Sequence, residues 1–379
     1  MREVCIIGAG IHRFGRFEKT VEEMGREAAV TALKSAGVEW KQIEAAFVSN
    51  ARFPVAVGHI TLTPLGRTGI SIIDTRAACA SGVTAMQQGY MAIASGMAEL
   101  VLVLGMEKMP RGFLNPEGTY APWMVAQGFS QNPLYWALRA RRHMELYGTT
   151  SAQLGKISVK NHRNGSLNPY AMYQKAMTLE EVLNSPMVND PLTLFMICAP
   201  NEGAGAVVLA SRKAARKYTG KPVILGTSVH RIALFPIVIS PTYRYTTKVE
   251  PIPVTTLAAT AAYEKTGTGP ADLDVIECQD TDAFSEIEAY EELGLCKRGE
   301  GGKLIESGDT EINGKVAVNP SGGLISKGEP LGASHLAQVV EIYWQLKGEA
   351  GPRQVKAARV GLAHVKGAGG NTGVSILKV

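Results

Sequence analysis

The chain has 379 residues, of which 45% are hydrophobic and 19% charged, a balance that fits a globular protein with a large core and excludes extended disorder. Its net charge of +5 comes from scattered Lys and Arg without a basic run, so we expect no nucleic acid partner. The longest apolar stretch, at residues 96–106, contains Glu99 and is far short of the ~20 residues of a membrane span, so we expect no membrane insertion. Glycine is abundant, with 41 residues, and predicts many tight turns and close backbone approaches.

The cysteines are scattered through the chain, at Cys5, Cys79, Cys198, Cys278 and Cys296. Because no two of them form a CxxC pair, we expect no metal site built by this chain. The first residues have neither the apolar length nor the cleavage site of a secretory signal. Free cysteines without a pairing pattern fit a reducing compartment, so we expect a cytoplasmic protein.

Hydrophobic periodicity predicts alternating strands and helices in the first part of the chain. In chain order, strands are expected at residues 4–8, 45–49, 72–75, 100–104 and 203–209, with an amphipathic helix at 21–36 and a helix of small residues at 83–95.

The later part repeats the same order. Strands are expected at residues 223–225, 274–278, 316–318 and 373–377, and helices at 255–265 and 332–345. This repetition favours a duplicated α/β fold with mostly parallel sheets. We place the N-terminal half at residues 1–220 and the C-terminal half at 221–379.

An insertion of about residues 109–200 interrupts the first half and predicts a binding lid, a subunit contact or, in the alternative, a solvated helical excursion. A helix is expected at 151–161, and Thr178 in T-L-E-E is expected to start another. The insertion is rich in aromatic and basic side chains: Phe113, Tyr120, Trp123, Phe129, Tyr135, Trp136, Arg139, Arg141 and Arg142. The arginines either meet an anionic ligand or lie on a solvated face.

Cys79 is the strongest chemical feature of the sequence. It lies in ACASG, where a predicted strand ends and a helix of small residues begins. A helix N-terminus favours the thiolate, so this position is expected to lower the Cys79 pKa and to make it a nucleophile. The alternative is a buried, inert cysteine, which is the more common fate of this residue type.

Five motifs in this sequence occur in the order found in thiolases, and the chain resembles the branch that contains the sterol-carrier-protein-type and archaeal thiolases. The motifs are RAACASG at 76–82, NEGAGA at 201–206, NPSGG at 319–323, GEPLGA at 328–333 and HVKGAGG at 364–370. The resemblance covers nearly the whole chain. It implies a duplicated five-layer αβαβα sandwich with an inserted loop domain.

The resemblance also implies acyl transfer between 3-oxoacyl-CoA and coenzyme A. Cys79 would attack the ketone carbon, the Cα–Cβ bond would break, and free coenzyme A would remove the acyl group from sulfur. The backbone N–H of Cys79 and that of a glycine, Gly367 or Gly369, would bind the thioester oxyanion. Asn319 is expected to be one of the residues that bind the substrate.

Two places depart from the thiolase pattern, and His364 is a further candidate. Glu329 stands where thiolases have the histidine of a GHP motif, so it is either a catalytic residue or a solvated acid at a helix start. Thr281 and Asp282 stand where the family anchors a catalytic water; they either orient water or cap the next helix. His364 precedes the glycine turn and is expected to shuttle protons; the alternatives are a buried core histidine and an alignment in which Val365 occupies that position instead.

Two other functions stay open: a ketosynthase-like condensing enzyme, and a degenerate thiolase-fold subunit that scaffolds a partner. By resemblance we expect a homodimer. The chain is also similar to thiolases that work with a small zinc-ribbon/OB-fold partner subunit, one of which cleaves benzoylsuccinyl-CoA in aromatic degradation.

Overall fold

The computed structural model describes residues 1–53, 55–112, 122–127, 131–234 and 252–379. Among them, ten strands form one sheet in the order β10-β9-β11-β12-β8-β1-β7-β4-β2-β3. The first-half strands are β1 (Val4–Gly15), β2 (Ala45–Ser49), β3 (Ser71–Thr75), β4 (Leu100–Lys108) and β7 (Glu202–Ser211). Those of the second half are β8 (Val223–Ile232), β9 (Val275–Glu277), β10 (Ala317–Val318), β11 (Val360–Gly367) and β12 (Asn371–Lys378).

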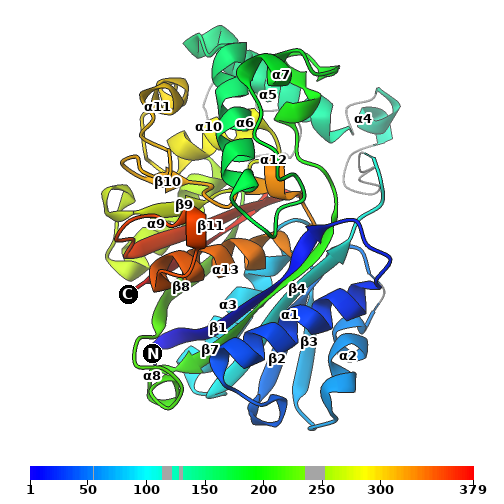
Figure 1. The fold of residues 1–379 in the computed structure, drawn as a ribbon, viewed down its shortest axis with the longest axis vertical. Helices are drawn as coiled ribbons and strands as arrows, with labels where there is room; N and C mark the ends of the chain where they lie inside the picture. Colours follow the sequence, from blue (N-terminus) through cyan, green and yellow to red (C-terminus); the bar gives the residue numbers. More distant parts are fainter. Residues whose placement is uncertain (54, 113–121, 128–130, 235–251) are drawn as a thin grey trace.

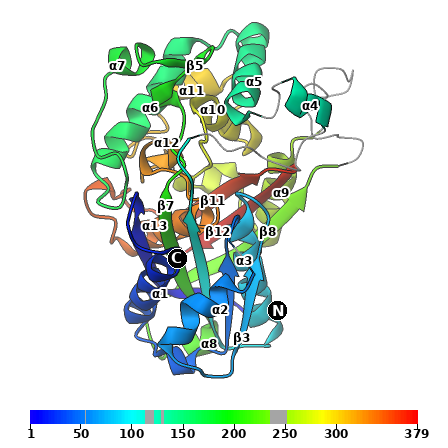
Figure 2. The ribbon, with the colours of Figure 1, turned by 90° about the vertical axis from the view of Figure 1, so that its right-hand side faces the viewer.

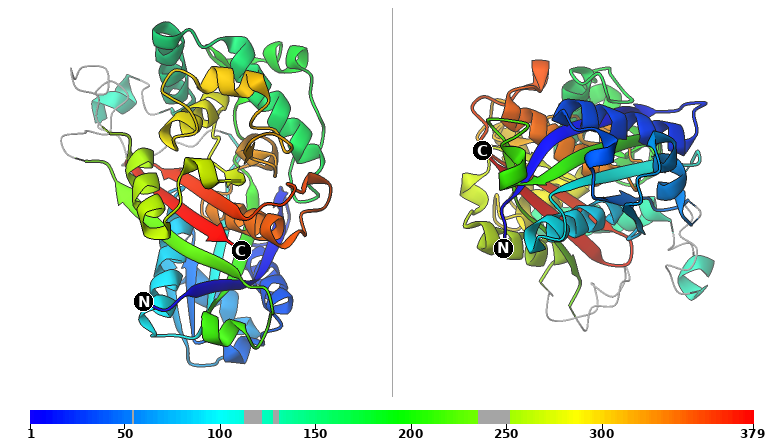
Figure 3. Two further views of the ribbon diagram at one scale, coloured as in Figure 1. Left: turned by 90° about the vertical axis from the view of Figure 1, so that its left-hand side faces the viewer. Right: turned by 90° about the horizontal axis from the view of Figure 1, so that it is seen from below.

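The two halves of this sheet repeat one pairing pattern. From β1 outward, β7 and β4 pair antiparallel and β2 and β3 pair parallel. From β8 outward, β12 and β11 pair antiparallel and β9 and β10 pair parallel. The two halves meet where Cys5 pairs with Ile224 and Ile6 pairs with Val223. Strand β8 therefore lies between β1 and the other strands of the second half (Figure 3). The predicted duplicated α/β fold is confirmed, but the expectation of mostly parallel sheets is wrong: the central pairings around β1 and β8 are antiparallel, and only the outer strands of each half pair in parallel.

Helices form the remaining layers. Helix α1 (Val21–Ala36) covers one face of the first half, while α9 (Val254–Thr266) covers the outer face of the second and α10 (Ala283–Glu292) packs on α9 and on helices of the inserted region. Helices α3 (Ser81–Ser95) and α13 (Ser334–Lys347) lie between the halves, since each of them packs on strands of both (Figures 1 and 2). The smaller helices are α2 (Val57–Leu62), α8 (Arg212–Ala215), α11 (Gly301–Ser307) and α12 (Gly323–Lys327).

Local sequence explains where α1 begins and how closely it packs. Thr20 and Glu23 form a capping box, and Gly37, at φ 66°, ends the helix. Its buried residues include Met24, Ala28 and Ala32 on one face. Gly8 and Gly10 of β1 allow this close packing, because a Cβ at either position would lie 2.5 Å from an α1 carbonyl oxygen.

The inserted region contains α4 (Pro122–Ala126), α5 (Asn132–Tyr147), α6 (Ser151–Ser166), α7 (Leu179–Leu183) and a hairpin of β5 (Met187–Asn189) and β6 (Leu192–Thr193). Helix α6 packs on α10, α11 and α12, and the region lies at the end of the molecule away from α1 and α2 (Figure 1). The predicted starts at Ser151 and Thr178 are confirmed, and both helices have capping boxes. Phe113, Tyr120 and Phe129 lie outside the described residues.

Of the helices that the structure describes, none combines the length and the apolar character needed to cross a membrane.

Candidate active site

Cys79 lies in a tight turn between β3 and α3. The preceding residue, Ala78, has φ 51°, a left-handed conformation that is strained for a residue with a Cβ. Ser81 holds this turn, because its Oγ accepts a hydrogen bond from the Ala77 N–H at 2.8 Å and donates one to the Ala78 carbonyl at 2.6 Å. The turn therefore presents the partly buried Cys79 thiol at the start of α3 in a fixed direction.

Glu329 reaches the same place from a loop that docks on the segment before β7. Its N–H donates to the Ala199 carbonyl at 2.9 Å, and Pro200 and Glu329 form a parallel bridge. The side chain of Asn201 donates to the Lys327 carbonyl at 3.0 Å and fills the space above Gly328, where a Cβ would lie 1.8 Å from Asn201 Nδ2. These contacts fix the loop and bury Glu329, which is 5% exposed.

Three neutral groups surround the Glu329 carboxyl. Gln279 Nε2 donates to its Oε1 at 2.7 Å, and the Cys198 thiol donates to its Oε2 at 3.2 Å. The Cys79 thiol lies close enough to this carboxyl and to Gln279 for both groups to shift its pKa. Because Gln279 Oε1 accepts from the Lys366 N–H at 2.6 Å, it ties the end of β9 to β11 and to Glu329.

Burial dominates the electrostatics of this site. It raises the pKa of Cys79 well above its ordinary value, and the nearby charge of Glu329 raises it further. Burial also raises the Glu329 pKa, while hydrogen bonds from Cys198, Cys79 and Gln279 lower it in part. The predicted lowering of the Cys79 pKa by the helix N-terminus is therefore wrong, because burial outweighs the effect of the helix terminus.

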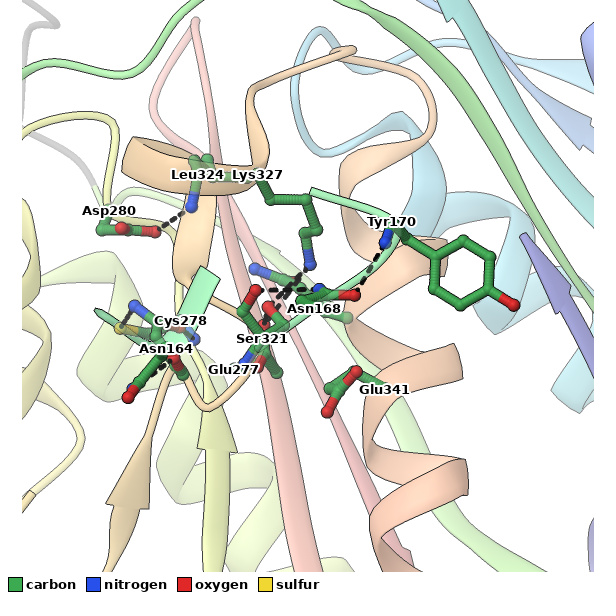
Figure 4. A network of polar contacts seen from close by, with 12 residues as sticks. Asn164, Asn168, Tyr170, Glu277, Cys278, Asp280, Ser321, Leu324, Lys327 and Glu341 are labelled. Atoms are coloured by element: carbon green, nitrogen blue, oxygen red, sulfur yellow. Dashed lines mark hydrogen bonds and ion pairs between the residues drawn. The ribbon is translucent and has the colours of Figure 1, made fainter. Parts of the chain in front are cut away.

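A buried polar network supports the loop that leads to Glu329 (Figure 4). Asp280 accepts from the N–H groups of Leu324 at 2.6 Å and Ile325 at 3.2 Å, which fixes the start of α12. The Ser321 hydroxyl donates to Glu277 at 2.6 Å and accepts from Lys327 Nζ at 2.9 Å. These residues hold the 319–328 segment against the end of β9, from which Gln279 projects.

Comparison with known proteins identifies the family. The family model for the thiolase N-terminal domain matches residues 4–213, and a model described as thiolase C-terminal domain-like matches residues 246–378. The chain belongs to the thiolase family. Among its relatives, the acetyl-CoA acetyltransferase of Methanothermobacter thermautotrophicus is 40% identical, with 99% of each chain covered. The benzoylsuccinyl-CoA thiolase subunit BbsB of Thauera aromatica is 34% identical, with 97% of this chain and 95% of that protein covered.

Solved structures share the fold. An Ltp2–ChsH2(DUF35) aldolase superposes with a TM-score of 0.88 at 24% identity, over 100% of this chain and 98% of the other. The human mitochondrial 3-ketoacyl-CoA thiolase in complex with CoA superposes with a TM-score of 0.75 at 17% identity, over the same shares. The thiolase fold and the acyltransferase class expected from the sequence are confirmed.

His364 does not join the thiol in this thiolase. Neighbouring residues of a strand point to opposite faces, and on β11 it is Val365 that packs with Ala80 and Val83 beside Cys79. His364 faces α9, where its Nε2 lies 3.1 Å from Thr255 Oγ1. Burial lowers the His364 pKa well below its ordinary value.

Thr281 and Asp282 serve the local structure. Asp282 caps α10 by accepting from the Ser285 N–H at 3.1 Å, which is the capping alternative considered from the sequence. The Thr281 carbonyl accepts from the Cys198 N–H at 2.9 Å and so positions that cysteine. Asn319 lies behind the site: its Oδ1 accepts from the Cys278 N–H at 2.9 Å, and its Nδ2 donates to Glu286 at 2.7 Å.

The glycine turn after β11 lies against the Cys79 loop. A Cβ on Gly367 would lie 2.7 Å from the Ala77 carbonyl oxygen, so only a glycine allows this approach. Gly369 follows in the turn with φ 89°. The proximity of these backbones is compatible with the expected oxyanion site.

The structure also corrects expectations about other side chains. Glu329 is buried, so its alternative as a solvated acid is wrong. Arg139 is buried and paired with Glu288, so it does not lie on a solvated face, whereas Arg141 pairs with Asp190 at the surface.

Sequence reasoning did not assign Gln279 and Cys198 to the site. Cys198 stands three residues before the NEGAGA motif. Its position next to that motif was the available signal. Gln279 precedes the Thr281–Asp282 pair, and its proximity to Glu329 depends on the docking of two distant loops.

Proposed function

We propose that this chain is a thiolase that transfers an acyl group from a 3-oxoacyl-CoA to coenzyme A through a thioester on Cys79. The observation that carries the proposal is the strained turn that presents the Cys79 thiol at the start of α3, close enough to the buried Glu329 carboxyl for each group to shift the pKa of the other. Glu329 takes the place of the family histidine as the acid-base group. The names of the relatives, which include an acetyl-CoA acetyltransferase, support the same reaction class.

In the first half-reaction, the Glu329 carboxylate takes the proton of Cys79 as sulfur attacks the ketone carbon. The Cα–Cβ bond then breaks, and the acyl group remains on sulfur. The electron pair of that bond stays on the departing CoA thioester as an enolate, which recovers the proton from Glu329. The proton that Glu329 removed is thereby returned, and a second acid is not required.

In the second half-reaction, Glu329 takes the proton of the coenzyme A thiol. The coenzyme A sulfur attacks the acyl thioester, Cys79 leaves as a thiolate, and Glu329 returns the proton to it. The N–H groups of Cys79 and of Gly367 or Gly369 bind the oxyanion in this step, a role supported by the close approach of Gly367 to the Cys79 loop.

The test is thiolysis of acetoacetyl-CoA by coenzyme A, with Cys79→Ala compared to the wild type. We expect Cys79→Ala to lose turnover by at least about a thousandfold, because the nucleophile is absent. Cys5→Ala, which changes a buried cysteine of β1, should retain the wild-type rate. Turnover by Cys79→Ala within tenfold of the wild type would refute the proposal.

A finer proposal concerns the substrate. Similarity to BbsB and the aromatic content of the inserted region support benzoylsuccinyl-CoA, whereas the acetyl-CoA acetyltransferase relatives support a short acyl chain. Parallel assays with acetoacetyl-CoA and benzoylsuccinyl-CoA distinguish them. Formation of benzoyl-CoA supports the aromatic substrate; its absence, with and without a zinc-ribbon/OB-fold partner present, would exclude it.

We further propose assembly as a homodimer that also binds a small zinc-ribbon/OB-fold partner. The partner is supported by the name of BbsB, which is a subunit, and by the DUF35 partner of the Ltp2 aldolase. The homodimer is supported by β3, the last strand of the sheet, whose outer edge is unpaired within the described chain and whose Ile73 is 42% exposed.

A further inference from the structure

A second thiol contacts the carboxyl that we propose as the acid-base group. Cys198 is 4% exposed, and its thiol donates to Glu329 Oε2 at 3.2 Å. Its backbone is held from two sides: its own N–H donates to the Thr281 carbonyl at 2.9 Å, and the next residue, Ala199, accepts from the Glu329 N–H at 2.9 Å. Cys198 and Glu329 are therefore fixed relative to one another by main-chain bonds as well as by the thiol.

The Glu329 carboxyl depends on neutral donors for its charge. Within the described part of the chain, the groups that lower its pKa are Cys198, Cys79 and Gln279, and none of them is a cation. A buried carboxylate without a cation is costly, so each of these donors carries a large share of its stabilisation.

The three donors are not equivalent during the reaction. Cys79 gives up its proton and then carries the acyl group, so in the acyl-enzyme it no longer donates to Glu329. Gln279 and Cys198 remain. Burial and the charge of Glu329 raise the pKa of Cys198 well above its ordinary value, so Cys198 keeps its proton and stays a donor throughout.

We propose that Cys198 is a positioning residue that holds the Glu329 carboxyl toward Cys79 and keeps it in the ionised, proton-accepting form, above all in the acyl-enzyme. The inference rests on the proposed function, since it assigns Cys198 a role through Glu329. It predicts that loss of the thiol affects the removal of the acyl group by coenzyme A more than its transfer to Cys79.

The test compares Cys198→Ala with Cys198→Ser in acetoacetyl-CoA thiolysis over a range of pH. Glu329 must be ionised to act as a base, so kcat/KM for acetoacetyl-CoA, which reports the free enzyme, and kcat/KM for coenzyme A, which reports the acyl-enzyme, both rise with pH through its ionisation. Without the thiol donor this acidic limb moves to higher pH by about half to one unit, the shift that corresponds to a lost hydrogen bond of about 1 kcal/mol. In Cys198→Ser the hydroxyl donates in place of the thiol, so the acidic limb of the pH profile should return to its wild-type position. Cys5→Ala, the matched removal of a buried thiol that lies outside the site, leaves the limb in place.

A second readout needs no turnover. The rate at which iodoacetamide alkylates Cys79, followed on the Cys79 peptide by mass spectrometry, should show the same shift in Cys198→Ala and its reversal in Cys198→Ser. If Cys198→Ala does not fold, Cys198→Val is used in its place, because valine has no donor and a side-chain volume similar to that of cysteine.

An acidic limb that stays in place in Cys198→Ala or Cys198→Val, with activity reduced equally at every pH, would overturn the inference and leave Cys198 a packing residue. Loss of the proposed function gives a different result, namely turnover in Cys79→Ala. The two failures are therefore distinguishable.

Discussion

The reactivity of Cys79 depends on a neighbouring residue more than on its place at the start of α3. A helix N-terminus stabilises a negative charge by about 0.3–1 kcal/mol, whereas burial shifts a pKa by up to about 3–5 units where it is complete, so that even partial burial can outweigh the helix terminus. Burial is the larger effect, and the charge of Glu329 acts in the same direction. At rest, Cys79 is therefore a protonated thiol beside Glu329 rather than a free thiolate.

Replacing this base tests that conclusion. Glu329→Gln keeps the side-chain volume and its contact with Gln279 but cannot accept a proton, so kcat/KM for acetoacetyl-CoA thiolysis should fall by about 10²–10⁴-fold. The urea unfolding midpoint checks that the variant is folded. A folded Glu329→Gln variant with a rate within threefold of the wild type would show that another group is the base.

The buried carboxyl of Glu107 should make the free energy of unfolding of the protein depend on pH. It is fully buried at the end of β4 and accepts from the N–H groups of Ala51 at 2.6 Å and Gly332 at 3.2 Å, and burial raises its pKa to about 7. The folded state thus binds this proton more tightly than the unfolded state. Its contribution to stability is full below the ordinary pKa of 4.5, falls as pH rises to about 7, and is then constant.

Glu107→Gln removes this ionisation. The free energy of unfolding of the variant relative to the wild type should increase between pH 4.5 and 8 by up to about 3 kcal/mol. Urea titrations at several pH values measure it. A difference between the two proteins that does not change with pH would contradict the shifted pKa.

At the scale of elements, the site depends on how closely α3 and α13 approach one another. Gly82, three residues after Cys79, lies where a Cβ would be 2.8 Å from the Cβ of His335 and 2.9 Å from Leu336 Cδ2. The first turn of α3 thereby packs on the first turn of α13, which begins at Ser334, two residues after Gly332 of the loop that carries Glu329. The packing of the middle layer thus helps to set the distance between the thiol and its base.

We expect Gly82→Ala to destabilise the protein by about 1–3 kcal/mol, because the added methyl group forces the two helices apart. It should also lower turnover. Gly220→Ala, at an open position with no atom within 4 Å, is the control and should change stability by less than about 0.5 kcal/mol. Equal stability of the two variants would contradict the close approach.

At the scale of the whole molecule, the sheet formed by the described residues ends at β3, whose last residue, Thr75, stands four residues before Cys79. An edge strand that pairs with its own copy about a two-fold axis is self-complementary. Because β3 leads directly into the Cys79 turn, such pairing would stiffen the site in both copies.

Light scattering after size-exclusion chromatography tests this assembly. The wild type should have the mass of a dimer, and Ile73→Lys, which puts a charge beside the edge, should shift it toward the monomer. Leu146→Lys, at a residue of α5 that is 50% exposed, is the matched control. A monomeric wild type, or a dimer that both variants retain, would contradict pairing through β3.

The fold was largely predictable because its signals are local. The strand at 45–49 and the helix at 21–36 have the predicted bounds, and the repeated order of elements predicted the two equivalent halves. Cys79 was found because its motif and its strand-to-helix position lie together in the sequence.

The rest of the site depends on long-range contacts. Gln279, Cys198 and Glu329 come from three separate loops, and their contacts arise only when those loops dock. His364 shows the other difficulty: one position along β11 decides between facing Cys79 and facing Thr255. The raised pKa of Cys79 could not be predicted, because the burial of a side chain cannot be read from its neighbours in the sequence.

The central claim is that Cys79 carries the acyl group, and mass spectrometry tests it most directly. The protein is mixed with acetoacetyl-CoA without free coenzyme A, quenched in acid and digested. We predict that the Cys79 peptide gains the mass of one acetyl group, that added coenzyme A removes it, and that Cys79→Ala gains nothing. Thiolysis that proceeds while the Cys79 peptide stays unmodified, or an acetyl group on Cys198 instead, would contradict the account.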